Sequence, residues 1–61
     1  MHVKMIYKIQ NEQTGQENEL EDTLNWPDIE KLDDAKKHVI AHLDGKWGQG
    51  KYLLLKTEEI S

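Results

Sequence analysis

The sequence predicts an α+β fold, a small ββαβ domain in which a three-stranded antiparallel sheet carries one helix packed on one face. Three observations support this. Apolar residues alternate with polar ones near the N-terminus, recur at helical spacing from residue 29 to residue 43, and form a short continuous run near the C-terminus. These are the patterns of a half-buried strand, an amphipathic helix and a buried strand. Because the chain has 61 residues, we expect one domain, residues 1–61.

The first predicted element is a strand at residues 3–10. Its core face is formed by alternate apolar residues, namely Val3, Met5, Tyr7 and Ile9. The opposite face is polar except for Ile6. A polar break at 11–16 follows, and Gly15 is the residue within it best suited to a positive φ.

A second strand is predicted at Glu17–Leu24, because Leu20 and Leu24 recur there at even spacing. Glutamate, aspartate and asparagine are poor strand formers, so an extended acidic loop is the alternative. If the first strand lies between the second and the third, the chain path gives an antiparallel sheet.

The dipeptide Trp26-Pro27 marks a boundary, since the residue before proline avoids the α region. We expect a short turn at Pro27–Lys31 and then a main helix at Asp34–Asp44, with Asp33 as N-cap and Gly45 just after the C-terminus. The apolar stripe that predicts the helix consists of Ile29, Leu32, Ala35, Val39 and Leu43.

A glycine-rich loop then leads to a third strand at Lys51–Thr57, which is apolar on both faces through its middle. Such a strand is either central or covered by something. The sheet face opposite the helix is therefore predicted to be partly bare. That face would carry Ile6 and either Leu54 or the pair Leu53 and Leu55.

The net charge of −4 conceals a strong segregation of charge. Residues 12–34 carry nine acidic residues against one lysine, a net −8, whereas residues 35–57 carry five lysines against one aspartate, a net +4. All eight basic residues are lysine, so the commonest specific contact to guanine, an arginine fork, is missing. The absence of cysteine excludes a disulfide scaffold, a thiol nucleophile and a cysteine-ligated zinc site.

Few residues suggest chemistry. His38 and His42 have the spacing of two metal ligands on one helix face, but two ligands are too few, and we expect ordinary boundary histidines. No serine or threonine has a neighbouring base, and no acidic pair is placed as a catalytic dyad. We therefore expect no enzymatic activity, no metal site and no cofactor.

Binding is the function that the sequence favours. A chain this short buries little apolar surface, so association with a protein partner or with a second copy would supplement its core. The candidate surfaces are the open sheet face and an acidic face. The acidic face is predicted to contain Glu17, Glu19, Glu21 and Asp22.

The alternative function is weak binding of single-stranded nucleic acid or of a nucleotide by the loop at residues 46–52. The residues in it that can stack on a base or meet a phosphate are Lys46, Trp47, Lys51 and Tyr52. The other interpretation is that Trp47 caps the core. A pI of about 5.2 argues against nucleic acid as the partner.

Neither a membrane span nor a signal peptide is predicted. The longest apolar stretch falls far short of the ~20 residues that cross a bilayer, and the N-terminal segment lacks a long apolar region followed by small residues. We expect a cytoplasmic protein that does not act at a membrane.

Overall fold

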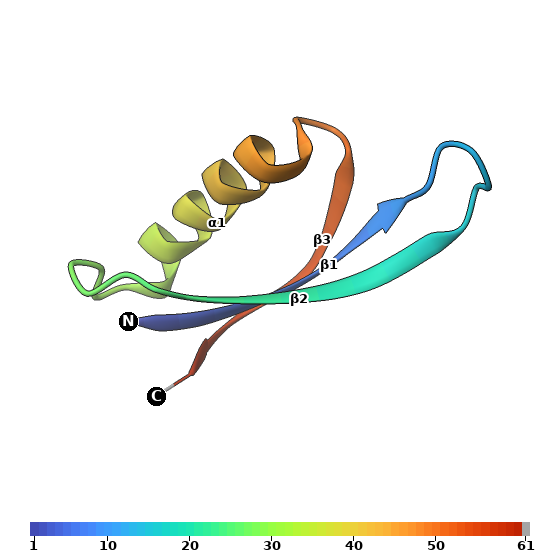
Figure 1. Cartoon of the computed structure of the whole chain (residues 1–61). Coiled ribbons are helices and arrows are strands. Elements are labelled where there is room, and N and C mark those ends of the chain that lie inside the picture. The colour runs from blue at the N-terminus through green and yellow to red at the C-terminus, as the bar shows by residue number, and fades with distance from the viewer. Residues whose placement is uncertain (61) are drawn as a thin grey trace.

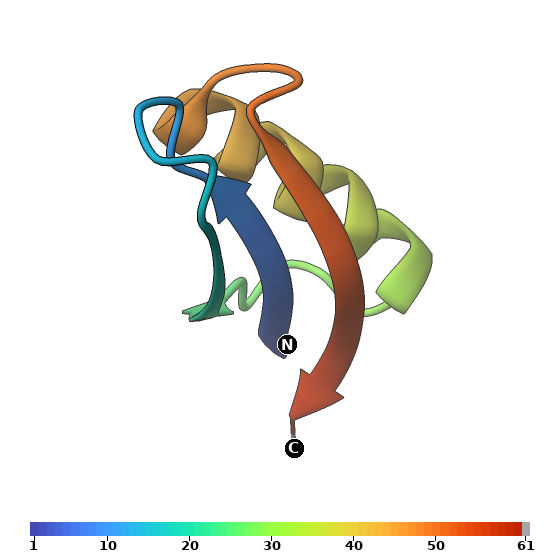
Figure 2. The same ribbon diagram turned by 90° about the vertical axis from the view of Figure 1, so that its right-hand side faces the viewer.

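A computed structural model describes residues 1–60 and confirms the predicted ββαβ architecture. Strands β1 (His2–Gln10), β2 (Glu17–Asn25) and β3 (Tyr52–Ile60) form one antiparallel sheet in the order β2-β1-β3. Helix α1 (Leu32–Trp47) covers one face of this sheet (Figure 1). Figure 2 shows that α1 runs diagonally behind β1 and β3.

The β1–β2 hairpin is set by its turn. The side chain of Asn11 accepts backbone hydrogen bonds from Gln13 at 2.9 Å and Thr14 at 3.4 Å, which holds the chain in a tight bend. Gly15 has a φ of +73°, as predicted. The turn fixes a register in which Val3 lies opposite Leu24 and Tyr7 lies opposite Leu20, so the apolar residues of both strands face α1.

The core lies between β1 and α1. Six of the described side chains are fully buried: Val3, Met5, Tyr7, Ala35, Val39 and Leu43. They are the alternate residues of the first strand and the helical stripe, and both patterns were expected to face the core. The prediction for Ile9 is met only in part, because this residue near the end of β1 is half-buried.

The predicted ends of the helix are wrong. α1 begins at Leu32, Lys31 occupies the N-cap position, and the side chain of Asp33 forms no cap. At the other end the helix continues through Gly45 to Trp47, and the residue that terminates it is Gly48, with φ +99° and ψ +147°. Glycine is the residue that tolerates this backbone conformation. The extra turn carries Trp47 back onto the core.

All three strands extend beyond their predicted bounds, β1 by one residue at its start, His2. β2 is a strand, not an acidic loop, and it extends to Asn25. β3 begins at Tyr52 and ends at Ile60, three residues beyond the predicted end, because β1 supplies pairing partners as far as His2.

β3 also contains a bulge. Ile6 pairs with Lys56 but Tyr7 pairs with Leu54, so Leu55 is an extra residue on β3. Before the bulge the even-numbered residues of β3 face α1, whereas after it the odd-numbered residues do. Leu53 lies on the outer face and Leu54 on the inner face, so the run of leucines does contribute apolar side chains to both faces.

The outer sheet face, opposite α1, is not covered by any element within residues 1–60, in line with the expectation of a partly bare face, but most of its side chains are charged. Lys4 lies 3.4 Å from Glu21 on β2 and 3.6 Å from Glu58 on β3, and Lys8 lies 3.8 Å from Glu17. These ion pairs run across all three strands. The register places Ile6, Leu53 and Ile60 as the apolar members of this face.

The molecule is thin and elongated, with extents of 39 × 19 × 14 Å. Its radius of gyration is 12.2 Å, against about 10.5 Å for a compact chain of this length. Its accessible surface is 4478 Å², against about 4,100 Å² for a monomer of this mass. The fold therefore leaves more surface open to solvent than its size requires. Within residues 1–60 no helix is long and apolar enough to cross a membrane.

The helix end can be tested with two glycine substitutions. Gly45→Ala should raise the free energy of unfolding by about 0.5–1 kcal/mol, because alanine is favoured inside a helix and the added methyl group projects into open space. Gly48→Ala should lower it by about 1–3 kcal/mol, because the positive φ is strained for any other residue. Urea unfolding measures both values. The opposite pattern of signs would place the helix end at Gly45.

Candidate interaction surface

The two aromatic residues of the predicted nucleotide-binding loop pack on the core. The indole Nε1 of Trp47 donates a hydrogen bond to the hydroxyl of Tyr7 at 3.0 Å. Tyr52 meets Tyr7 edge-on, with ring centroids 6.5 Å apart, and its hydroxyl donates to Asp44 at 2.7 Å. This bond, together with partial burial, raises the pKa of Tyr52. Both rings are thus held against Tyr7 and do not form an open stacking platform.

The two lysines of this loop form ion pairs. Lys46 lies 2.9 Å from Asp22 on β2, and Lys51 lies 3.0 Å from Glu12 in the hairpin turn. The hydrogen bond to Asp22 raises the pKa of Lys46. Both cations are therefore partly neutralised by residues of the acidic segment.

Asp22 is the centre of a small polar cluster between β2 and the end of α1. Its carboxylate accepts hydrogen bonds from Tyr7 at 3.0 Å and Lys46 at 2.9 Å, and His42 lies 3.4 Å away. Desolvation of this side chain, which is 18% exposed, opposes its ionisation. The hydrogen bonds outweigh that effect and hold the pKa of Asp22 below its ordinary value. The cluster ties the helix end to the sheet.

The predicted acidic face is divided between the two sides of β2. Asp22 points toward α1, whereas Glu17, Glu19 and Glu21 lie on the outer face and are exposed. Glu17 and Glu21 pair with Lys8 and Lys4, respectively. The exposed acidic face therefore consists of Glu17, Glu19 and Glu21 alone.

The two histidines take separate partners. His38 Nδ1 lies 2.9 Å from the carbonyl oxygen of Asp34, and its ring packs against Trp26 with centroids 5.6 Å apart. His42 faces Asp22. Among residues 1–60, no three histidine, cysteine or acidic side chains are placed to hold a metal ion.

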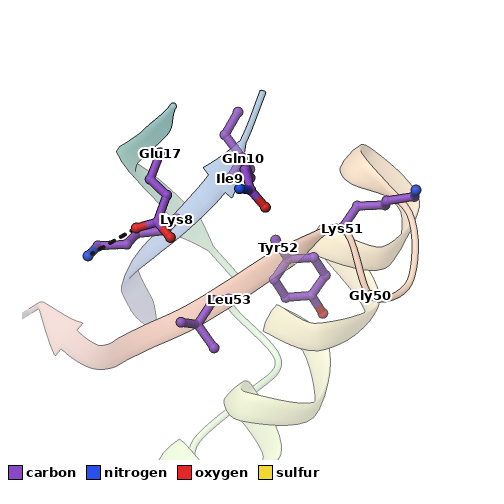
Figure 3. A pocket seen from close by; sticks show the side chains of 8 residues that line it. All are labelled: Lys8, Ile9, Gln10, Glu17, Gly50, Lys51, Tyr52 and Leu53. Carbon is purple, nitrogen blue, oxygen red and sulfur yellow. Dashed lines mark ion pairs between the residues drawn. The ribbon is translucent and has the colours of Figure 1, made fainter. Parts of the chain in front are cut away.

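A shallow hollow of about 170 Å³ lies where β1 ends and β3 begins (Figure 3). In this view Lys8 is turned toward Glu17, while Tyr52 and Leu53 leave β3 on opposite sides. Ligand sites usually combine an enclosed shape with polar groups that converge on one point. The side chains around this hollow diverge, so it is a poor candidate for a ligand site.

A second hollow, of about 300 Å³, separates α1 from β3, and we call it the α1–β3 groove. Its lining residues are Lys36, Ile40, Leu54, Leu55, Lys56 and Thr57. Two large apolar side chains in it are open to solvent, Ile40 at 47% and Leu55 at 44% exposure. Sequence reasoning missed this surface, because Ile40 lies outside the helical stripe and Leu55 reaches the edge only through the bulge.

The groove adjoins the open edge of β3. Both outer strands of the sheet have an unpaired edge within residues 1–60, but the two edges differ in charge. β2 carries four acidic residues in nine, a common protection against unwanted strand pairing. β3 instead exposes Leu53, Leu55 and Ile60. The β3 edge and the groove together form the most apolar exposed surface of the described chain.

Comparison of the chain with protein-family models, with curated proteins and with solved structures finds no match.

The Asp22 cluster makes a pH-dependent contribution to stability. Because the pKa of Asp22 is lower in the folded chain, its stabilisation is present at neutral pH and declines as the pH falls below the ordinary value of 3.8. Asp22→Asn should lower the free energy of unfolding by about 1 kcal/mol at neutral pH and by much less at about pH 2.5. Urea unfolding followed by tryptophan fluorescence measures this difference.

Glu19→Gln is the matched control, because Glu19 lies on the same strand but is exposed on the outer face. It should change the free energy of unfolding by less than about 0.5 kcal/mol at neutral pH. An Asp22→Asn effect of equal size at both pH values would show that the carboxylate acts through its shape and not its charge.

Proposed function

We propose that this protein is a small protein-interaction module that binds its partner along the open edge of β3 and in the adjoining α1–β3 groove. The observation that carries this proposal is the contrast between the two sheet edges. The β2 edge carries three exposed glutamates, Glu17, Glu19 and Glu21, whereas the β3 edge has unpaired backbone groups beside exposed apolar side chains. That combination suits the addition of a strand from a partner, in which backbone hydrogen bonds supply affinity and side-chain pockets supply specificity.

Leu55 and Ile40 are the residues that would provide this specificity. They come from β3 and α1, respectively, and border the same groove. An apolar side chain of the added strand would contact both of them and would lose water on binding. Removing the apolar surface of both side chains from water would contribute to the binding energy.

The acidic face has a supporting role in this proposal. Glu17, Glu19 and Glu21 repel other acidic segments and attract basic ones, which influences the rate and selectivity of association more than its strength. Direct binding of a basic partner to the acidic face is the competing version of the same function.

Nucleotide binding gains no support from the geometry, because Trp47 and Tyr52 pack on Tyr7 and the neighbouring lysines are paired. We propose that the module has no enzymatic activity and acts in the cytoplasm. The lack of cysteine supports that location, since small secreted domains commonly depend on disulfides.

Site-specific photo-crosslinking in cells tests the binding edge. A benzophenone amino acid in place of Leu55 should yield a discrete covalent adduct, because this side chain lies at the centre of the proposed surface. The same group in place of Glu19 is the matched control on the opposite edge, and it should yield none. An adduct at Glu19 and none at Leu55 would favour the acidic face. Adducts at neither position would overturn the proposal.

A further inference from the structure

We infer that the partner that pairs with the β3 edge is a second copy of this chain, joined antiparallel about a two-fold axis at Thr57. This inference rests on the proposed function, because it names the occupant of the same edge. The result would be a dimer with one continuous six-stranded sheet.

The backbone groups available for pairing follow from the sheet register. Trp26 donates its N–H to the carbonyl of Met1 at 2.9 Å, and the amino group of Met1 donates back to Trp26 at 2.8 Å. Residues with odd numbers in β1 therefore bond to β2, and those with even numbers bond to β3. On β3 the partners of these even-numbered residues include Lys56 and Glu58. The residue between them, Thr57, must then turn its N–H and C=O toward the open edge.

The side chains on either side of Thr57 determine the register. In an antiparallel pair centred on Thr57, Lys56 of each chain lies opposite the partner's Glu58, so two reciprocal ion pairs form on the outer face. A pair centred on Lys56 would instead place two lysines together, and one centred on Glu58 would place two glutamates together. Opposite charges across strands are favourable and like charges are unfavourable. The segment is thus self-complementary in the register centred on Thr57.

The ion pairs within one chain already hold the side chains of Lys56 and Glu58 on the outer face. Lys56 lies 3.2 Å from Glu58 of its own chain, and Glu58 also lies 3.6 Å from Lys4. Glu58 remains 37% exposed in this position, which leaves room for a lysine from a second chain. The hydrogen bond and charge of Lys56 lower the pKa of Glu58, so the carboxylate is ionised at neutral pH.

The inner face also becomes complementary in this register. The two-fold axis places both α1 helices on the same side of the joined sheet, with the two α1–β3 grooves facing each other across the axis. Ile40 and Leu55 of both copies then lie around one shared apolar seam. The partner's Glu59 comes opposite Leu55, beside the groove that Lys36 lines. Lys36 and the partner's Glu59 therefore place opposite charges near each other on the inner face, in addition to the ion pairs on the outer face.

The dimer also accounts for the shape of the single chain. A body only 14 Å thick with six fully buried side chains among its described residues has a small core. Joining two copies along β3 extends this core across the axis. The acidic β2 strands become the outer edges of the six-stranded sheet, and their like charges oppose further growth, so assembly stops at two.

A charge-swap experiment on the purified chain tests both the dimer and its register. The wild-type protein should sediment at twice the 7.2 kDa of one chain. Lys56→Glu places two glutamates opposite each other at both pairs, and Glu58→Lys places two lysines there. Each variant alone should therefore associate at least about tenfold more weakly. Mixing the two variants restores opposite charges at both positions, so the mixture should recover the wild-type mass as a heterodimer.

A cysteine crosslink tests the axis without changing any charge. The chain contains no cysteine, so Thr57→Cys introduces a single thiol at the two-fold axis. Mild oxidation should convert this variant into a disulfide-linked dimer, whereas Thr23→Cys on the exposed β2 edge should remain a single chain. Circular dichroism confirms that every variant is folded.

The outcomes separate this inference from the proposed function. A monomeric wild-type protein with no Thr57→Cys crosslink would overturn the dimer, and a Leu55 adduct to a different protein would still support the binding edge. A dimer whose mass is unchanged by both charge variants would overturn the register. Recovery of the dimer on mixing supports it, because that register makes the two variants complementary.

Discussion

The hydroxyl group of Tyr7 imposes the main constraint on this fold. Tyr7 lies in the central strand and is fully buried, so its hydroxyl must be hydrogen-bonded within the protein. It accepts a bond from Trp47 at the end of α1 and donates one to Asp22 on β2. The helix must therefore extend far enough to bring the indole of Trp47 within hydrogen-bond distance of this hydroxyl, and β2 must turn the carboxylate of Asp22 inward. One buried polar atom thus connects three of the four elements.

The sequence was sufficient to predict what depends on local geometry. Alternation along residues 3–10 and the three-to-four spacing up to Leu43 follow from the shapes of a strand and a helix, so the order of elements and the six buried side chains were predictable. The helix ends were not. Gly45 and Gly48 are both reasonable terminators locally, and the contact of Trp47 with Tyr7, 40 residues away, determines which one is used.

The candidate surface was less predictable than the core, for two physical reasons. A bulge depends on the pairing of β3 with β1, which a single-strand pattern does not contain, so Leu55 could not be assigned to a face. The acidic block was visible in the sequence, but strand alternation divides it, and Asp22 becomes part of the structural cluster while Glu17, Glu19 and Glu21 remain outside.

The segregation of charge along the chain acquires a structural meaning at the sheet edges. An open three-stranded sheet has two edges that can pair with other strands, and a small domain that leaves both unprotected is prone to aggregate. Here the negative residues gather on β2, and β3 keeps its leucines with one lysine and two glutamates placed about Thr57. The first edge resists pairing with copies of itself, while the second favours one register. The distribution of charge therefore limits which edge can associate, and a net charge of −4 does not reveal this.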